Sequence, residues 1–225
     1  MAAIRTIAGL ALACLVSGCA SWFDRGSANS AMPDETVMNG FGVAATDMPL
    51  GVDMPDFKVE AVNVEVPETL VVSEANSYFP KGDIVWRGDP PGDRHEQVAA
   101  IFQDGLTRGA AKLQGEVPVN LDVEVLRFHA LTEKTRYSVG GIHSIRFELG
   151  IRSAETGLLL EPTRTVQADL KGYGGSRAIA ADQQGQTQKV RITDHLSEVI
   201  VTELTDPEGY KNQRLGLIQI FDNQF

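Results

Sequence analysis

Residues 145–152 have the sequence Ile-Arg-Phe-Glu-Leu-Gly-Ile-Arg, in which apolar residues alternate strictly with polar residues or glycine. Successive side chains of a β-strand point to opposite faces of a sheet, so this alternation predicts a strand with one buried and one solvated face. A turn-forming stretch follows at residues 153–157. The apolar positions that continue the alternation in the next predicted strand are Leu158, Leu160, Val166, Ala168 and Leu170. Half-solvated strands joined by a short turn are typical of an antiparallel sheet.

Two further strands are predicted upstream. Residues 117–125 alternate between apolar and polar side chains, and the phase changes at Leu126 and Phe128, which predicts a β-bulge. Residues 57–66 alternate in two stretches around a one-residue phase change and stop at Pro67. Short apolar runs at 71–72 and 84–86 indicate edge strands.

Two amphipathic helices are predicted. The first begins after Asp93, a favourable N-cap with Glu96 three residues later, and its apolar stripe extends to Leu113 before Gly115. The second covers residues 187–204 and stops before Pro207. The glycine- and glutamine-rich stretch 172–188 between the sheet and this helix is predicted to be a loop.

The order of these elements predicts an α+β fold, with an antiparallel sheet of about four or more strands and two helices packed on one face. This domain is expected to cover residues 57–206. Residues 19–56 have no sustained periodicity and are predicted to be a flexible tether. Residues 207–225 form a C-terminal tail with an apolar stretch at 215–221, which is expected to dock on its own domain, with a partner as the alternative.

Residues 1–18 have the features of a secretory signal peptide. Arg5 is followed by an apolar run at residues 7–16 and then by small residues. The apolar run is about half the length that a membrane-spanning helix needs, which is about 20 residues. The segment is therefore expected to direct export and then to be removed.

Val16-Ser17-Gly18-Cys19 resembles the lipobox of bacterial prolipoproteins. This resemblance implies cleavage after Gly18, acylation of Cys19 and anchoring to a membrane on its periplasmic side. Two or more acyl chains on one residue give stable anchoring, whereas a single chain binds reversibly. Ala20 follows the cysteine, where an aspartate would imply retention in the inner membrane, so the resemblance implies the outer membrane. An ordinary signal with an incidental cysteine is the alternative.

The predicted domain is similar, in the order of its elements over residues 57–205, to the ABC-transport auxiliary lipoproteins. Residues 83–87 (Asp-Ile-Val-Trp-Arg) and 91–94 (Pro-Gly-Asp-Arg) also resemble uncharacterised small envelope lipoproteins. These resemblances imply a role in an envelope complex and supply no catalytic motif. Function does not follow from architecture alone.

Charge and cysteine content exclude several classes of protein. Without residues 1–18 the chain keeps 19 basic and 30 acidic residues, a net charge of −11. This balance opposes nucleic-acid binding, which needs a basic surface. Cys14 leaves with the signal and Cys19 is the acylation site, so no disulfide or thiolate metal site can form. No cofactor is expected.

Two patterns suggest chemistry, and each has a simpler explanation. Ser176 lies in a motif one residue different from the nucleophile elbow of serine hydrolases, with Asp182 or Asp194 and then His195 downstream. The hydrolase fold needs a mainly parallel sheet, and a flexible loop is the simpler explanation of this motif. The polar stretch 89–96 could supply oxygen and imidazole ligands, but helix capping already explains Asp93 and Glu96, so no metal site is predicted.

A cluster of basic residues between positions 127 and 152 is the candidate docking face for an acidic partner or a lipid phosphate. Arg127, Arg146 and Arg152 are its principal members, and Arg146 and Arg152 are expected to point outward because they alternate with apolar residues. A solvated face without a partner is the alternative.

The sequence therefore favours a membrane-anchored, non-enzymatic interaction module of a cell-envelope complex, active in transport or envelope maintenance. Its expected partners are the membrane, through the lipid anchor, and another envelope protein, with no nucleic acid. The alternative is a periplasmic protein that binds a lipid or small apolar ligand in a groove between sheet and helices. A serine hydrolase acting through Ser176 is a distant alternative.

Overall fold

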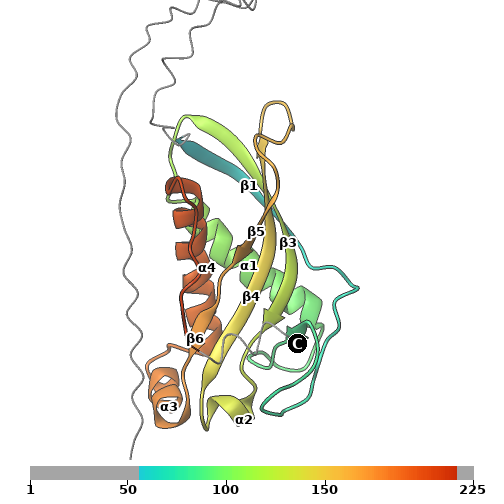
Figure 1. Ribbon diagram of the computed structural model, residues 1–225, viewed down its shortest axis with the longest axis vertical. Helices are drawn as coiled ribbons and strands as arrows, with labels where there is room; N and C mark the ends of the chain where they lie inside the picture. The colour runs from blue at the N-terminus through green and yellow to red at the C-terminus, as the bar shows by residue number, and fades with distance from the viewer. Residues whose placement is uncertain (1–55, 217–225) are drawn as a thin grey trace, which may run out of the picture. The chain divides into compact units, whose positions relative to one another are not determined.

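The computed structural model describes residues 56–216, and the fold is α+β as predicted (Figure 1). The elements in chain order are β1 (Phe57–Glu65), β2 (Ile84–Val85), α1 (Arg94–Ala110), β3 (Val117–His129), α2 (Glu133–Arg136), β4 (Gly141–Ser153), β5 (Arg164–Gln167), β6 (Leu170–Gly172), α3 (Gly175–Gln183) and α4 (Gln188–Thr205). Within this range no helix has the length and apolar character needed to cross a membrane.

The sheet is mixed rather than wholly antiparallel. Its main path runs β1-β3-β4-β5, with β2 paired to β3 and β6 paired to β4. The pairings β3–β4, β4–β5 and β4–β6 are antiparallel, whereas β1–β3 and β2–β3 are parallel. The parallel pairing of β1 with β3 follows from the helix between them, because a strand–helix–strand connection returns the chain in the same direction.

Both phase changes in the alternation correspond to irregularities in strand register. The register of β1 against β3 shifts between Val59 and Ala61, and that of β3 against β4 shifts between Val125 and Arg127. An extra residue in one strand moves the following side chains to the other face, which keeps Phe128 in the core.

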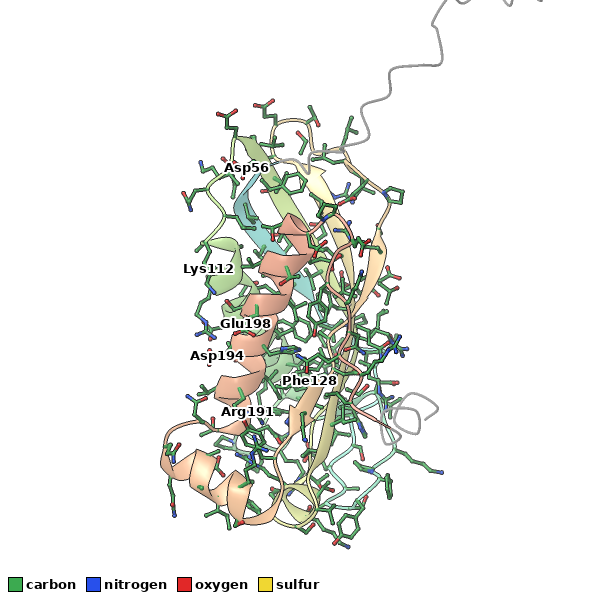
Figure 2. All side chains as sticks on the ribbon, turned by 60° about the vertical axis from the view of Figure 1, so that its left-hand side comes forward. Asp56, Lys112, Phe128, Arg191, Asp194 and Glu198 are labelled. Carbon is green, nitrogen blue, oxygen red and sulfur yellow. The ribbon has the colours of Figure 1, made fainter. Side chains whose placement is uncertain are left out.

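Helices α1 and α4 pack against each other and cover one face of the sheet (Figure 1). Gly105 and Gly109 of α1 allow close approach, because a Cβ atom at Gly109 would lie 2.5 Å from the carbonyl oxygen of Ser197 in α4. Polar contacts cross the outer side of the pair: Lys112 donates to Ser197 Oγ at 3.1 Å, and Arg108 pairs with Asp194 at 3.0 Å (Figure 2).

The space between the helices and the sheet is filled by a continuous apolar core. A chain of aromatic contacts runs through it, from Trp86 to Phe128 at 5.7 Å between ring centroids, then to Phe102 at 6.0 Å and to Phe147 at 5.6 Å. All four side chains are fully buried. Buried side chains occupy this layer, and the pocket described below lies outside it.

Three local expectations were wrong. Residues 175–183 form helix α3, although the stretch was expected to be a loop. The first helix ends at Ala110 rather than near Gly115. Leu158 and Leu160 are 68% and 47% exposed, because β5 begins only at Arg164 and these residues lie beyond the edge of the core.

Candidate functional site

An open, mostly apolar pocket of about 720 Å³ lies at the end of the sheet where β3 finishes and β4 begins. Its lining comes from the loop before β2, the end of β3, α2 and the turn into β4. The lining residues are Tyr78, Phe79, Pro80, Lys81, Arg127, His129, Ala130, Leu131, Thr132, Thr135, Val139, Gly140, Gly141 and Ile142. The side chains of Arg127 and His129 flank the inward-facing Phe128, so the floor of the pocket belongs to the helix-free face of the sheet.

One wall of the pocket is the loop of residues 73–81, and buried charge holds this loop in place. The guanidinium of Arg94 is 5% exposed and donates to both carboxylate oxygens of Glu74, at 2.6 and 3.1 Å. Arg87 donates to the Glu74 carbonyl at 2.8 Å and to Glu133 of α2 at 2.5 Å. A bidentate arginine–carboxylate contact fixes orientation as well as distance, so the loop has a defined position over the strands.

The opposite wall is α2 with the turn that follows it, and this wall binds the loop directly. Thr132 Oγ1 donates to the carbonyl oxygen of Ser77 at 2.8 Å, and the backbone N–H of Lys134 donates to Asn76 Oδ1 at 2.9 Å. The turn is also held from behind, where Gly140, at φ +72°, meets Gly174 so closely that neither position has room for a Cβ atom. Both walls are therefore braced by contacts within the protein.

His129 connects the floor of the pocket to the loop. Its Nε2–H donates to the carbonyl oxygen of Pro80 at 3.0 Å, since a carbonyl can only accept. Burial, with help from the positive charge of Arg127, lowers the pKa of His129 to about 4. The ring is therefore neutral at neutral pH, and it acts as a hydrogen-bond donor to the pocket wall.

His143 supports the same floor from the helix side of the sheet. It is 1% exposed, and its Nδ1 accepts from the backbone N–H of Leu131 at 3.3 Å. Burial lowers the pKa of His143 to about 3, and the nearby charges of Arg191 and Arg136 act in the same direction. A neutral ring with an unprotonated Nδ1 is the form that can hold Leu131 in place.

The rim of the pocket is apolar and exposed. Phe79 on one wall and Val139 on the other are each 75% exposed, and Tyr78 is 43% exposed. Lys81 and Arg127 are the cationic members of the lining, which contains no aspartate or glutamate. The pocket thus combines an apolar surface with positive charge on a protein that has an excess of acidic residues.

The structure brings two of the three predicted docking arginines together. Arg127 and Arg146 are cross-strand partners next to the pocket; Arg127 is buried and Arg146 is half-buried. Arg152 lies six residues further along β4, or about 20 Å away, and donates to Asp122 at 2.5 Å. Between them the helix-free face carries a row of opposed carboxylates in register, which are Glu65, Glu124 and Glu148.

The residues of the possible serine hydrolase do not form a catalytic arrangement. Asp182 pairs with Arg136 of α2, and Asp194 pairs with Arg108 of α1. His195 is buried and packs edge-on against Tyr210 at 5.9 Å between ring centroids. Burial lowers the pKa of His195. Ser176 is exposed in the first turn of α3, and each of its possible partners makes a different structural contact.

The polar stretch 89–96 has structural roles. Asp89 accepts from the indole of Trp86 and from Lys189, both at 2.9 Å, and Asp93 caps α1 by accepting from the backbone of His95 and Glu96. Among residues 56–216, no group of three or more metal-ligating side chains is arranged to hold an ion. The proposed acylation motif, Val16 to Cys19, lies outside the described residues, as do the tether up to residue 55 and the tail from residue 217.

No sequence motif predicted the pocket, although its apolar residues leave a signal in the sequence. Tyr78, Phe79 and Pro80 are apolar residues in a segment with no periodicity, and Val139 stands alone before a pair of glycines. Large apolar residues outside any strand or helix stripe are candidates for an exposed site. Their assembly into one pocket depends on contacts between segments more than 50 residues apart.

Solved structures similar to this chain include three bacterial proteins. A provisionally assigned lipoprotein from Caulobacter crescentus CB15 has 15% identity and a TM-score of 0.30, over 63% of this chain and 87% of the other. A Xanthomonas campestris protein of family DUF330 has 11% identity and a TM-score of 0.38, over 68% and 88%. PelC from Paraburkholderia phytofirmans, solved as a dodecamer, has 11% identity and a TM-score of 0.32, over 67% and 88%.

The descriptions of these proteins name no enzymatic activity. No protein of curated function matches the sequence. A family model without an assigned function matches residues 57–220, which include the whole α+β domain. The chain therefore belongs to the family of unknown function DUF6778.

Proposed function

We propose that this protein is a lipoprotein, anchored through Cys19 to the periplasmic side of the outer membrane, that serves as a non-enzymatic accessory module of a cell-envelope complex. Cleavage after Gly18, at the motif begun by Val16 and Ser17, would produce the mature chain. Ala20 after the cysteine favours the outer membrane. Transport across the envelope or maintenance of the envelope is the expected process.

The observation that carries this proposal is the braced apolar pocket with its exposed rim. Soluble monomers rarely expose contiguous apolar surface, and such patches mark sites of interaction. Phe79 and Val139 are far more exposed than a core would leave them, yet buried polar contacts hold both walls in place. A pocket that is formed in advance loses little conformational entropy when its partner binds.

The charge of the pocket indicates the chemistry of the partner. Lys81 and Arg127 are the charged residues of the pocket lining, and Arg146 lies next to Arg127 on β4. An apolar segment with a neighbouring carboxylate or phosphate fits these groups. Arg152 stands apart with Asp122 and would contribute only to a partner that extends along β4.

Site-specific photocrosslinking in cells tests the proposal. A photoreactive amino acid at Val139 is expected to give one discrete adduct with an envelope protein, and the same group at the exposed Ser176 is expected to give none. Phe79→Ser and Lys81→Glu should each reduce the Val139 adduct several-fold, because both lie at the pocket. Lys171→Glu, a charge reversal at another exposed site, serves as the matched control. Equal adducts at Val139 and Ser176, or an adduct unaffected by either pocket variant, would refute the docking role.

The anchor is tested separately. Cys19→Ser should leave the chain unacylated and move it from the membrane fraction to the soluble fraction, with the domain still folded. Persistence of this variant in the membrane fraction, with normal maturation, would contradict the lipid anchor.

A second candidate function is the binding of a lipid or another small apolar molecule. It is favoured by the pocket volume, about 720 Å³, which lies in the usual range for ligand sites of roughly 300–1,000 Å³. Native mass spectrometry of the chain from residue 20 onward, purified from the periplasm, would reveal a bound mass that Phe79→Ser reduces. A ligand-free spectrum together with a specific protein adduct at Val139 would favour partner docking instead.

A further inference from the structure

The hairpin between β4 and β5 projects beyond the core and carries three consecutive exposed leucines. We call residues 154–163 the leucine arm. Backbone hydrogen bonds pair its returning side with the end of β4, from Ser153 N to the carbonyl of Leu158 and from Leu160 N to that of Ile151, both at 2.9 Å. Leu158, Leu159 and Leu160 are 68%, 43% and 47% exposed. Because side chains alternate along an extended chain, the arm presents leucine on both of its faces.

The arm lies at the end of the domain where the described chain begins. The backbone N–H of Val117 donates to the carbonyl of Asp56, and that of Ala154 donates to the carbonyl of Pro118, both at 3.0 Å. The start of β1, the start of β3 and the base of the arm are therefore adjacent. Figure 2 shows Asp56 at this end of the domain. The pocket lies at the opposite end of β3, 13 residues and about 40 Å away.

The composition of the arm excludes attraction to a charged surface. Its ionisable residues are Glu155 and Glu161, and Glu161 is already paired with Arg164 at 2.5 Å. The arm has no lysine or arginine to bind anionic headgroups. The arm can therefore contact a partner only through aliphatic side chains. The apolar partner nearest to an N-terminal lipid anchor is the bilayer itself.

We propose that the leucine arm inserts into the acyl region of the membrane that holds the lipid anchor, so that the domain stands on the bilayer with its pocket turned away. This inference rests on the proposed anchoring at Cys19. The tether keeps the arm close to the bilayer, and this high effective concentration allows a weak contact to persist. Without an anchor, three leucines are too few to recruit the protein to a membrane.

The test uses the chain from Cys19 onward with its single cysteine coupled to a maleimide lipid in phosphatidylethanolamine–phosphatidylglycerol vesicles. Leu158→Trp, in a Trp22→Phe background, places a fluorophore on the arm, while the fully buried Trp86 remains as a constant signal. Acyl-chain-brominated lipid is expected to quench the arm tryptophan at least twofold. The effect should persist at 1 M salt, because it involves no charge pairing.

Ile179→Trp on α3 is the matched control, because Ile179 is 47% exposed and belongs to a helix at the pocket end of the domain. It should remain unquenched. Equal quenching at both positions, or none at Leu158→Trp, would overturn the proposal. A concentration-dependent blue shift without vesicles would also overturn it, by assigning the arm to a second copy of the chain. The anchor here is synthetic, so failure would leave acylation of Cys19 and the pocket crosslink unaffected.

Discussion

The two ends of the domain both expose large apolar side chains, but they do so by different structural means. The pocket end is concave, and its walls are held by buried polar groups, including Arg94 and His129. The leucine arm projects from the domain and is held mainly by backbone hydrogen bonds with the end of β4. A preformed pocket needs buried polar contacts to keep its walls apart. A projecting hairpin needs only its backbone hydrogen bonds. Substitutions should therefore have large effects at the pocket end and small ones at the arm.

The largest effect is expected at the brace of the pocket wall. Arg94→Met removes the contacts with Glu74 and leaves the carbonyl of Asp89 without its donor, while the Pro90 carbonyl keeps its bond from Gln97. We expect the free energy of unfolding to fall by about 3 kcal/mol, because buried polar groups lose their partners. Urea denaturation measures this change in the free energy of unfolding. Arg108→Met, which removes the more exposed pair with Asp194, is the control and should cost less than about 1 kcal/mol. Equal losses of stability in the two variants would show that the buried contacts of Arg94 stabilise the domain no more than an exposed ion pair does.

A smaller effect on stability is expected at the contact between helices α1 and α4, which lies between the pocket end and the arm end of the domain. Gly109→Ala should lower the free energy of unfolding by about 2 kcal/mol, because overpacking against Ser197 and Ile200 outweighs the better helix propensity of alanine. Hydrogen exchange should show reduced protection in both β3 and β4 over their whole length. Protection lost at one end alone would mean that the two ends unfold independently.

Acidification should weaken the pocket end selectively. The folded protein holds the pKa of His129 at about 4, below the ordinary 6.5, so the unfolded chain binds the proton more readily. The stabilising contribution is complete above pH 6.5 and is lost progressively as the pH falls from 6.5 towards 4. The expected loss is about 1.4 kcal/mol per pH unit. His143, with a pKa of about 3, acts in the same direction.

His129→Gln isolates this effect, because an amide can still donate to Pro80 but does not titrate. Urea denaturation at pH 6.5 and 5.5 should show a loss of stability that is smaller in the variant by about 1 kcal/mol. The two proteins should be close in stability at pH 7.5. The same pH dependence in both would mean that His129 is not the titrating group.

The smallest effect is expected at the arm. Leu158→Ser should change the free energy of unfolding by less than about 0.5 kcal/mol, because Leu158 is 68% exposed. Leu131→Ser, in the pocket floor at 8% exposure, should cost at least about 2 kcal/mol. Thermal denaturation of the two variants in parallel provides the measurement. A large loss at Leu158 would show that the arm is part of the core.

The sequence predicts the elements whose signal is local. The bulge in β3, the N-cap at Asp93 and the second helix were all predicted from periodicity and capping residues. Helix α3 was missed because its residues have only a weak apolar stripe, with Ala178 as the single buried side chain. Leu158 and Leu160 kept the correct phase but lie beyond the core, and periodicity specifies the face of a strand without specifying whether anything covers that face.

The sequence by itself determined the α+β class, the strand phases and the starts of helices α1 and α4, because alternation and N-caps depend on neighbours within a few residues. Only the tertiary structure decided that Arg127 and Arg146 meet while Arg152 stands apart, and that Phe79 and Val139 line the same pocket. These relations depend on register and on which loop folds over which strand. Contacts between distant segments set both, and no local pattern encodes them.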